Sequence, residues 1–273
     1  MYGFMSESVL YMAAGGFGVG FLVGLTGVGA GALMTPMLIT GFGVNPTIAV
    51  GTDLLFASIT KASAAVRHHR MGNVDWRILK WLALGSLTSA TATLAWLYFA
   101  APDTRSMAST IRATLAVLLV ASAIIIPLCP RLLCAMNRDD VPLDVPPRPA
   151  STVAFGLVLG CLVTLTSVGA GAIGVAVLSL LYPALLARRI VGTDVVHAIP
   201  LAFLSGAGHL GLGHVDWSIL ATLLIGSIPG ILIGSRLTGT LPDWLLRITL
   251  SLVLLYAAYL LSPALMAQFS KAA

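Results

Sequence analysis

The chain has 273 residues, of which 58% are hydrophobic and only 9% carry a formal charge. Soluble domains carry about 25% charged residues, so this chain lacks the charges that a water-facing surface needs. The composition excludes a soluble enzyme, a disordered chain and a nucleic-acid-binding protein. It indicates an integral membrane protein whose partner is the lipid bilayer. The net charge of +5 is then explained by the excess of Lys and Arg in cytoplasmic loops.

Two long segments without Asp, Glu, Lys or Arg lie at residues 8–52 and 149–187. Each is too long for one bilayer crossing, which takes about 20 helical residues. Glycine-rich breaks interrupt them, TGVGAG at 26–31 and TSVGAG at 166–171. We therefore expect each segment to form a broken or re-entrant pair of short helices, at 9–26 with 31–41 and at 152–166 with 171–183.

Three fuller transmembrane spans are expected after each broken pair, at 48–66, 78–100 and 111–128, and at 190–207, 217–236 and 244–262. The segment 130–149 is rich in proline and charge and is the one loop with the composition of a linker. We divide the chain into a first transmembrane repeat (1–129), a cytoplasmic linker (130–149) and a second transmembrane repeat (150–273).

The two repeats match in sequence. Residues 28–32 and 168–172 both read VGAGA, 140 residues apart, and residues 50–53 and 191–194 both read VGTD, 141 residues apart. Further matches follow at the offset of 141, namely GxVDW at 72–76 and 213–217, His68 and His209, and Gly-Ser at 85–86 and 226–227. Several matches in one order at a nearly constant offset indicate an internal duplication.

The distribution of basic residues predicts that the repeats are inverted. Loop 67–80 holds four Lys or Arg and its partner 208–217 holds none, whereas loop 184–189 holds two and its partner 42–47 holds none. With these two basic loops in the cytoplasm and both termini outside, 11 of the 15 Lys and Arg lie inside. We expect an all-α polytopic protein of two inverted-topology repeats in a bacterial-type plasma membrane.

Glycine-interrupted helices at matching positions of inverted repeats point to the central site of a secondary transporter. A broken helix exposes backbone N–H groups that hydrocarbon cannot satisfy, so the break is tolerated beside a cavity or within protein. At the N-terminus of a half-helix these N–H groups and the helix dipole favour an anion. Packing between helices is the alternative interpretation of the glycines, above all for those spaced four apart.

Residues 24–36 read GLTGVGAGALMTP and are followed by VGTDL at 50–54, and related patterns recur at 164–176 and 191–195. Over about residues 9–262 the chain resembles the sulfite exporter TauE/SafE family of membrane permeases. The resemblance implies transport, commonly outward, of sulfite, sulfonates or other small sulfur-containing anions. The second copy has Ser167 where the first has Gly27, so the two half-sites need not contribute equally.

The expected substrate site lies at the two breaks, near the middle of the membrane. Its residues are those of the breaks together with one threonine on each span that follows and a lysine on the first of them: Thr26, Gly27, Val28, Gly29, Gly31, Thr52, Lys61, Thr166, Ser167, Val168, Gly169, Gly171 and Thr193.

A proton-coupling role is expected for Asp53 and Asp194, with His68 and His209. Each aspartate follows Gly-Thr near the start of its span, so an N-terminal helix cap is the alternative interpretation. Lys61 is the one intramembrane lysine, and seven residues separate it from His68 on one helix face, so it is a candidate to attract the anion that His68 helps to protonate. A satisfied hydrogen bond is the alternative role for the two histidines.

Three other classes of function compete with anion transport. A cation carrier or channel would use Asp53 and Asp194 as ligands, and a scaffold or receptor subunit would leave the paired breaks without a role. An intramembrane enzyme is disfavoured because no metalloprotease or Gly-x-Ser-x-Gly motif occurs. The three cysteines show no CxxC spacing, so we expect no metal ion or cofactor.

Overall fold

The computed structural model describes residues 2–26, 31–100, 103–136, 146–237 and 242–272. These residues form ten α-helices and one short π-helix, and no strand occurs among them. In chain order the elements are α1 (Tyr2–Thr26), α2 (Gly31–Pro36), η1 (Met37–Gly41), α3 (Pro46–Arg70), α4 (Trp76–Ala100), α5 (Thr104–Met136), α6 (Pro149–Thr166), α7 (Ala172–Leu181), α8 (Ala187–Gly211), α9 (Trp217–Arg236) and α10 (Asp243–Ala272).

Seven of the helices in the described part of the chain are long and apolar enough to cross a membrane. They are α6 and the six helices that correspond to the expected full spans, so the expectation of an all-helical polytopic membrane protein is confirmed. The expected broken pairs correspond to α1 with α2 and η1, and to α6 with α7. The first member of each pair is longer than expected, with 25 residues in α1 and 18 in α6. Helix α5 continues into the expected linker and ends at Met136.

Two aspartates at equivalent positions of the repeats set where α4 and α9 begin. One carboxylate oxygen of Asp75 accepts hydrogen bonds from the backbone N–H groups two and three residues later, at 3.1 and 3.2 Å. The same oxygen of Asp216 does so at 2.8 and 3.0 Å. These are N-terminal caps, which satisfy N–H groups that the first helical turn leaves free. The sequence VDW therefore has the same structural role in both repeats.

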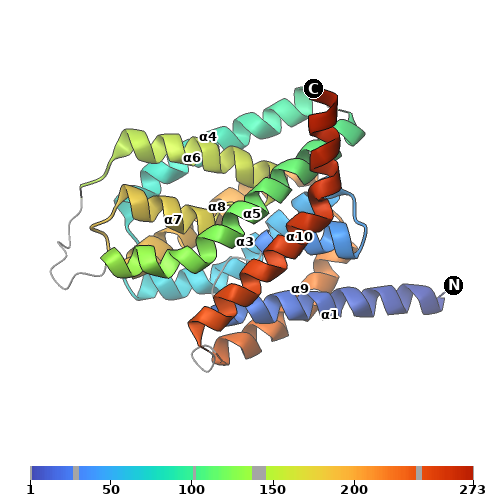
Figure 1. Ribbon diagram of the computed structural model, residues 1–273, viewed down its shortest axis with the longest axis horizontal. Coiled ribbons are helices and arrows are strands. Elements are labelled where there is room, and N and C mark those ends of the chain that lie inside the picture. The colour runs from blue at the N-terminus through green and yellow to red at the C-terminus, as the bar shows by residue number, and fades with distance from the viewer. Residues whose placement is uncertain (1, 27–30, 101–102, 137–145, 238–241, 273) are drawn as a thin grey trace.

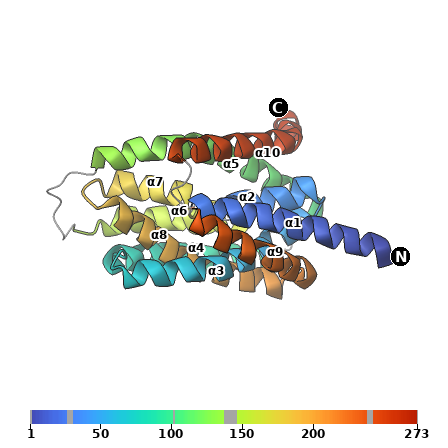
Figure 2. The same cartoon turned by 90° about the horizontal axis from the view of Figure 1, so that it is seen from below.

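The repeats are interlocked rather than side by side. Helix α1 of the first repeat packs along α9 of the second, and α6 of the second packs along α4 of the first. The remaining long helices pair with their own equivalents, α3 with α8 and α5 with α10. Figures 1 and 2 show α5 and α10 side by side in one outer layer, with α3 on the opposite side of the bundle. The α3–α8 pair lies between the exchanged helices.

Glycines allow the exchanged helices to approach closely. A Cβ on Gly20 of α1 would lie 2.5 Å from the carbonyl oxygen of Ser227 in α9. A Cβ on the equivalent Gly160 of α6 would lie 2.1 Å from the carbonyl oxygen of Ser86 in α4. Both distances are shorter than any real contact, so these positions require glycine. For these spaced glycines the packing interpretation is confirmed.

The hydrophobic core surrounds the α3–α8 pair. Phe56 of α3 packs in a cluster with side chains of α5, α9 and α10, whereas Leu201 of α8 packs with side chains of α4, α6 and α7. Large apolar side chains are exposed on the outer helices, among them Phe99 and Tyr256. A bundle that is apolar both inside and outside suits a lipid environment.

Candidate functional site

Helices α3 and α8 carry the two buried carboxylates. Asp53 is fully buried and Asp194 is 1% exposed. Helix α3 begins at Pro46, after the N-cap Asn45, and α8 begins at Ala187. Each aspartate is therefore the eighth residue of its helix and lies in the helix interior. The capping interpretation is wrong for both, because a cap must precede the first helical turn.

Asp53 is held by a threonine of the first broken pair. The hydroxyl of Thr35 in α2 donates a hydrogen bond of 2.5 Å to Oδ2 of Asp53. Its other oxygen, Oδ1, has no hydrogen-bond partner among the described residues. The hydroxyl of Ser167, in the second break, lies beside the same carboxylate and is likewise buried without a partner in this part of the chain.

Asp194 lies against the second broken pair but receives no hydrogen bond from the described residues, at either oxygen. Its neighbour is Gly174 of α7, where a Cβ would meet Oδ1 at 2.0 Å. The backbone of Gly171 is also close. The residue equivalent to Thr35 is Val175, which has no hydroxyl to donate. The two carboxylates are thus equivalent in sequence and different in environment.

Lys61 of α3 connects the carboxylates with the second break. Its ammonium group donates to the carbonyl oxygen of Ala170 at 3.5 Å. Its charge interacts with both Asp194 and Asp53 and reaches His197 of α8. With both carboxylates ionised and the lysine protonated, the sum of these charges is −1. One added proton makes the cluster neutral.

The second break turns the chain sharply between α6 and α7. Thr166 ends α6, and its hydroxyl bonds to the carbonyl of Leu162 at 2.6 Å and accepts from Val168 N at 3.2 Å. Ser167 has the left-handed φ of 61°, and two glycines with φ of 137° and 126° follow, Gly169 and Gly171. Helix α7 then starts without a side-chain cap. The N–H of Gly174 in its first turn bonds to the carbonyl oxygen of Gly169 at 3.0 Å, which leaves the N–H groups of Ala172 and Ile173 for another acceptor.

The two breaks meet in space. A Cβ on Gly31, the first residue of α2, would lie 2.3 Å from the carbonyl oxygen of Ser167. Val168 contributes only its backbone to the break, since its side chain is buried in the hydrophobic core. The remaining expected residues of the first break, Gly27, Val28 and Gly29 and the side chain of Thr26, lie outside the described residues.

Two equivalent threonines, one residue before each aspartate, join the repeats reciprocally. The hydroxyl oxygen of Thr52 accepts a hydrogen bond from Asp216 N at 3.1 Å, and that of Thr193 accepts from Asp75 N at 2.9 Å. The start of α3 thus contacts the loop after α8, and the start of α8 contacts the loop after α3. The two helices are therefore antiparallel, and their threonine oxygens serve as acceptors between repeats.

Each matched histidine lies at the opposite end of its own helix from its aspartate. His209 and His68 each follow their aspartate by 15 residues, which is about 22 Å along a helix. The Nε2 atom of His209 is 2.9 Å from the carbonyl oxygen of Thr164, and its Nδ1 is 3.3 Å from Nδ1 of His214. His68 is half-buried near the end of α3, about 10 Å along the helix from Lys61. Because α3 and α8 are antiparallel, His209 lies beside the start of α3, where a Cβ on Gly51 would be 3.0 Å from the His209 Cβ, two residues before Asp53.

Two residues of the cluster were missed from the sequence. Thr35 stands in the quoted motif, but its pairing with Asp53 spans 18 residues and carries no local signal. His197 follows Asp194 by three residues, a spacing that places both on one helix face. Its Nε2 lies 2.6 Å from the hydroxyl of Ser86 in α4, and its Nδ1 has no partner in the described part of the chain.

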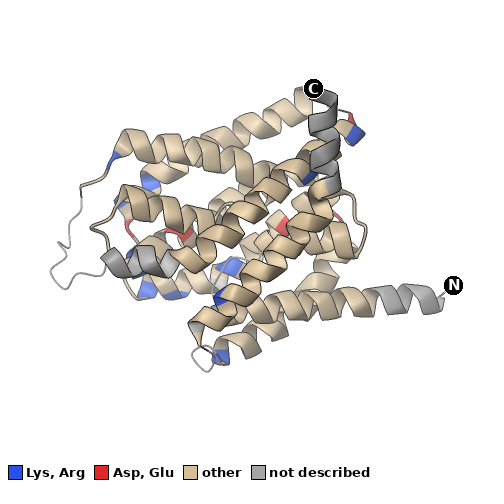
Figure 3. Cartoon of the chain, viewed as in Figure 1, with Lys and Arg blue, Asp and Glu red and all other residues tan. Residues whose placement is uncertain are grey.

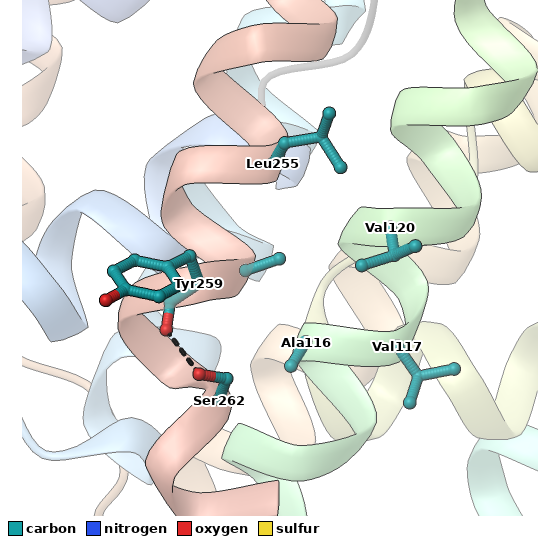
Figure 4. Close-up of a pocket in the computed structure, with 7 residues that line it drawn as sticks. Ala116, Val117, Val120, Leu255, Tyr259 and Ser262 are labelled. Carbon is teal, nitrogen blue, oxygen red and sulfur yellow. Dashed lines mark hydrogen bonds between the residues drawn. The ribbon is translucent and has the colours of Figure 1, made fainter.

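An apolar groove of about 450 Å³ lies between α5 and α10. Figure 4 shows its side chains, among them Val117, Val120 and Leu255, with Tyr259 beside Ser262, whose hydroxyl bonds to the Tyr259 carbonyl at 2.7 Å. No charged side chain lines it. This surface suits lipid rather than an anion.

Residues 12–261 match the family described as "Sulfite exporter TauE/SafE". This chain belongs to the sulfite exporter TauE/SafE family. As a member, it is a membrane transporter and not an enzyme. The matched residues include both breaks and both aspartates, so the cluster at α3 and α8 is built from residues that carried the resemblance.

Relatives of known sequence are also named as transporters. The chain is 39% identical over 236 residues to "Probable membrane transporter protein YjnA" of Bacillus subtilis (strain 168), covering 86% of this chain and 91% of the relative. It is 26% identical over 250 residues to "Probable membrane transporter protein YdhB" of the same organism, covering 91% and 94%. No solved structure matches the chain.

Proposed function

We propose that this TauE/SafE family member is a secondary transporter of small sulfur-containing anions of the sulfite or organosulfonate type. The family's name supplies the substrate class. The observation that carries the proposal is the meeting of two helix breaks at Gly31 and Ser167, beside a half-buried ammonium group. Uncapped N–H groups at the start of α7, the hydroxyl of Ser167 and Lys61 are donors for an anion.

The arrangement of the repeats supports alternating access between two sides of a membrane. The reciprocal bonds of Thr52 and Thr193 lie at opposite ends of the antiparallel α3–α8 pair. Equivalent loops therefore lie at opposite ends of the bundle, as inverted-topology repeats require. Lys and Arg gather mainly at the left-hand end in Figure 3, which we assign to the cytoplasm of a bacterial-type plasma membrane, with both chain termini outside.

Charge counting supports proton linkage. An anion next to a cluster of net charge −1 is repelled, and burial away from water strengthens the repulsion. Protonation of one carboxylate makes the cluster neutral and removes the repulsion, so the anion binds more favourably together with a proton. We propose Asp53 and Asp194 as the coupling sites. We propose His68 and His209 for the proton's path; His209 packs against Gly51, two residues before Asp53. Outward transport is the direction that the family name implies.

A cation carrier is the second candidate, and one observation favours it. Three buried carboxylate oxygens, Oδ1 of Asp53 and both oxygens of Asp194, lack a hydrogen-bond donor among the described residues. A sodium ion has oxygen ligands of this kind. Lys61 argues against it, because a positive charge already interacts with both carboxylates.

Reconstituted protein in liposomes tests the proposal. We expect uptake of sulfite and propanesulfonate down an imposed pH gradient, at clamped membrane voltage and fixed substrate protonation. The Asp53→Asn variant should transport without responding to the gradient, whereas Asp103→Asn, an exposed aspartate outside the cluster, should behave as the wild type. Flux that responds to a sodium gradient and not to anion competitors would instead establish the cation carrier.

A further inference from the structure

A second polar site lies at one mouth of the α3–α8 pair. Here the turn after α3 faces the start of α8 and encloses a pocket of about 530 Å³. Its walls are Met71, Gly72, Asn73, Leu186, Arg188 and Arg189. The pocket is separate from the carboxylate cluster. None of the residues that line it was expected from the sequence to bind substrate.

The pocket has a net positive charge. Arg188 is exposed, and Arg189 is partly buried with its guanidinium 3.5 Å from Oδ2 of Asp75. Asp75 is the one acidic residue in loops 71–75 and 184–189. Its other oxygen caps α4, so its charge is shared between the cap and Arg189. The pocket therefore offers positive charge to a ligand.

Membrane topology alone does not explain why the two arginines lie at the start of α8. Arg188 and Arg189 lie in the first turn of α8, where the helix dipole disfavours cations. Basic residues in the loop or at a helix C-terminus would satisfy the positive-inside rule without that conflict. The equivalent helix, α3, has no Lys or Arg in its first turn and is capped by Asn45, which accepts from Thr47 N at 3.0 Å. Leu186 provides no such cap to α8.

We propose that this pocket binds a small oxyanion of sulfur or phosphorus, with Arg188 as its principal charged contact. The amide of Asn73 is a further donor, and Met71 and Leu186 form an apolar wall that suits a short alkyl chain. An alkanesulfonate satisfies both features. The phosphate of a lipid headgroup has the same oxyanion chemistry and is the other source of such a ligand.

The pocket lies on the path to the central cluster. Asp75, at its edge, is joined to Thr193 of α8, and Asp194 follows directly. Given the proposed anion transport, the pocket is the site where substrate gathers before it reaches the breaks. Because the equivalent mouth has no paired arginines, this step occurs at one face only.

Binding of propanesulfonate to the full-length protein in nanodiscs of zwitterionic lipid tests the inference. We expect Arg188→Gln to raise the half-saturating concentration at least fivefold and Arg188→Lys to recover part of the loss. Lys80→Gln is the matched control, since Lys80 is exposed, belongs to the same basic region and does not line the pocket. It should change binding less than twofold.

A second arm separates the two sources of oxyanion. If a lipid headgroup occupies the pocket, anionic lipid weakens propanesulfonate binding by the wild type and leaves Arg188→Gln unaffected. Equal behaviour of Arg188→Gln and Lys80→Gln in both kinds of nanodisc overturns the inference. Uptake of sulfite by the wild type in liposomes would then still stand as evidence for the proposed function, so the two failures are distinguishable.

Discussion

The hydroxyl of Thr35 donates a 2.5 Å hydrogen bond to Asp53, while the equivalent residue beside Asp194 is a valine. One carboxylate is therefore fixed by a donor from its own broken pair, and the other has no donor among the described residues. A duplicated chain has acquired two buried acids with different surroundings. We expect them to differ in function.

Replacement of Thr35 by valine should destabilise the protein. The bond ends on a carboxylate, and such bonds contribute about 1.5–3 kcal/mol. Unfolding in detergent, followed by tryptophan fluorescence, should show a lower midpoint for Thr35→Val. Thr40→Val is the control, because the Thr40 hydroxyl bonds only to the carbonyl of Pro36 one turn earlier. Equal midpoints for the two variants would show that the short bond contributes nothing.

Glycine in the α1–α9 contact is predicted to be indispensable. In Gly20→Ala the new methyl group would overlap the Ser227 carbonyl, so the helices must separate. Overpacking of this kind costs about 1–3 kcal/mol. Gly18→Ala is the matched control on the same helix, because nothing lies within 4 Å of its Cβ position. Thermal unfolding should separate the variants, and a loss of stability in both would contradict the packing argument.

A substitution in the second break should abolish transport. Gly169 has a φ of 137°, and its Cβ would lie 3.2 Å from Leu159 and 3.3 Å from Val163. Gly169→Val is therefore strained and crowds the break. We expect normal amounts of protein in the membrane and no anion flux in liposomes, with Gly18→Val as the active control. Wild-type flux from Gly169→Val would exclude the break as the substrate site.

Labelling of cysteines tests the inverted topology. Arg77 and Ser218 occupy equivalent positions, and both are exposed. In a variant without the three native cysteines, a membrane-impermeant maleimide applied from outside should label Ser218→Cys and leave Arg77→Cys unmodified until the cells are opened. Labelling of both in intact cells would remove the assignment of opposite sides to equivalent loops.

Much of the architecture follows from local sequence. Uncharged stretches of bilayer length predicted the spans, and residues 217–236 coincide with α9. The start of one span was misplaced. Helix α5 begins at Thr104, before the expected start at residue 111, and includes Arg105, because a helix continues beyond the apolar core into the interface. The repeat also placed the two breaks correctly.

The interior of the site was less predictable. The bond from Thr35 to Asp53 and the contact of His197 with Ser86 join residues from different helices. Such pairs depend on how helices cross, and periodicity within one helix does not contain that information. Asp53 and Asp194 were predicted as proton-coupling residues, but their sequence contexts, both VGTD, gave no sign that one would have a donor and the other none.

The interlocking of α1 with α9 has a consequence during synthesis. Helix α1 ends at Thr26, whereas α9 begins only at Trp217. At a translation rate of roughly 5–20 residues per second, α9 is synthesised about 10–40 s after α1. During that time the glycine-rich face of α1 has no partner helix. Helix α4 likewise precedes its partner α6 in synthesis, by a shorter interval. The first repeat therefore cannot mature alone, and the insertion machinery must hold its helices in the bilayer until the second repeat has been delivered.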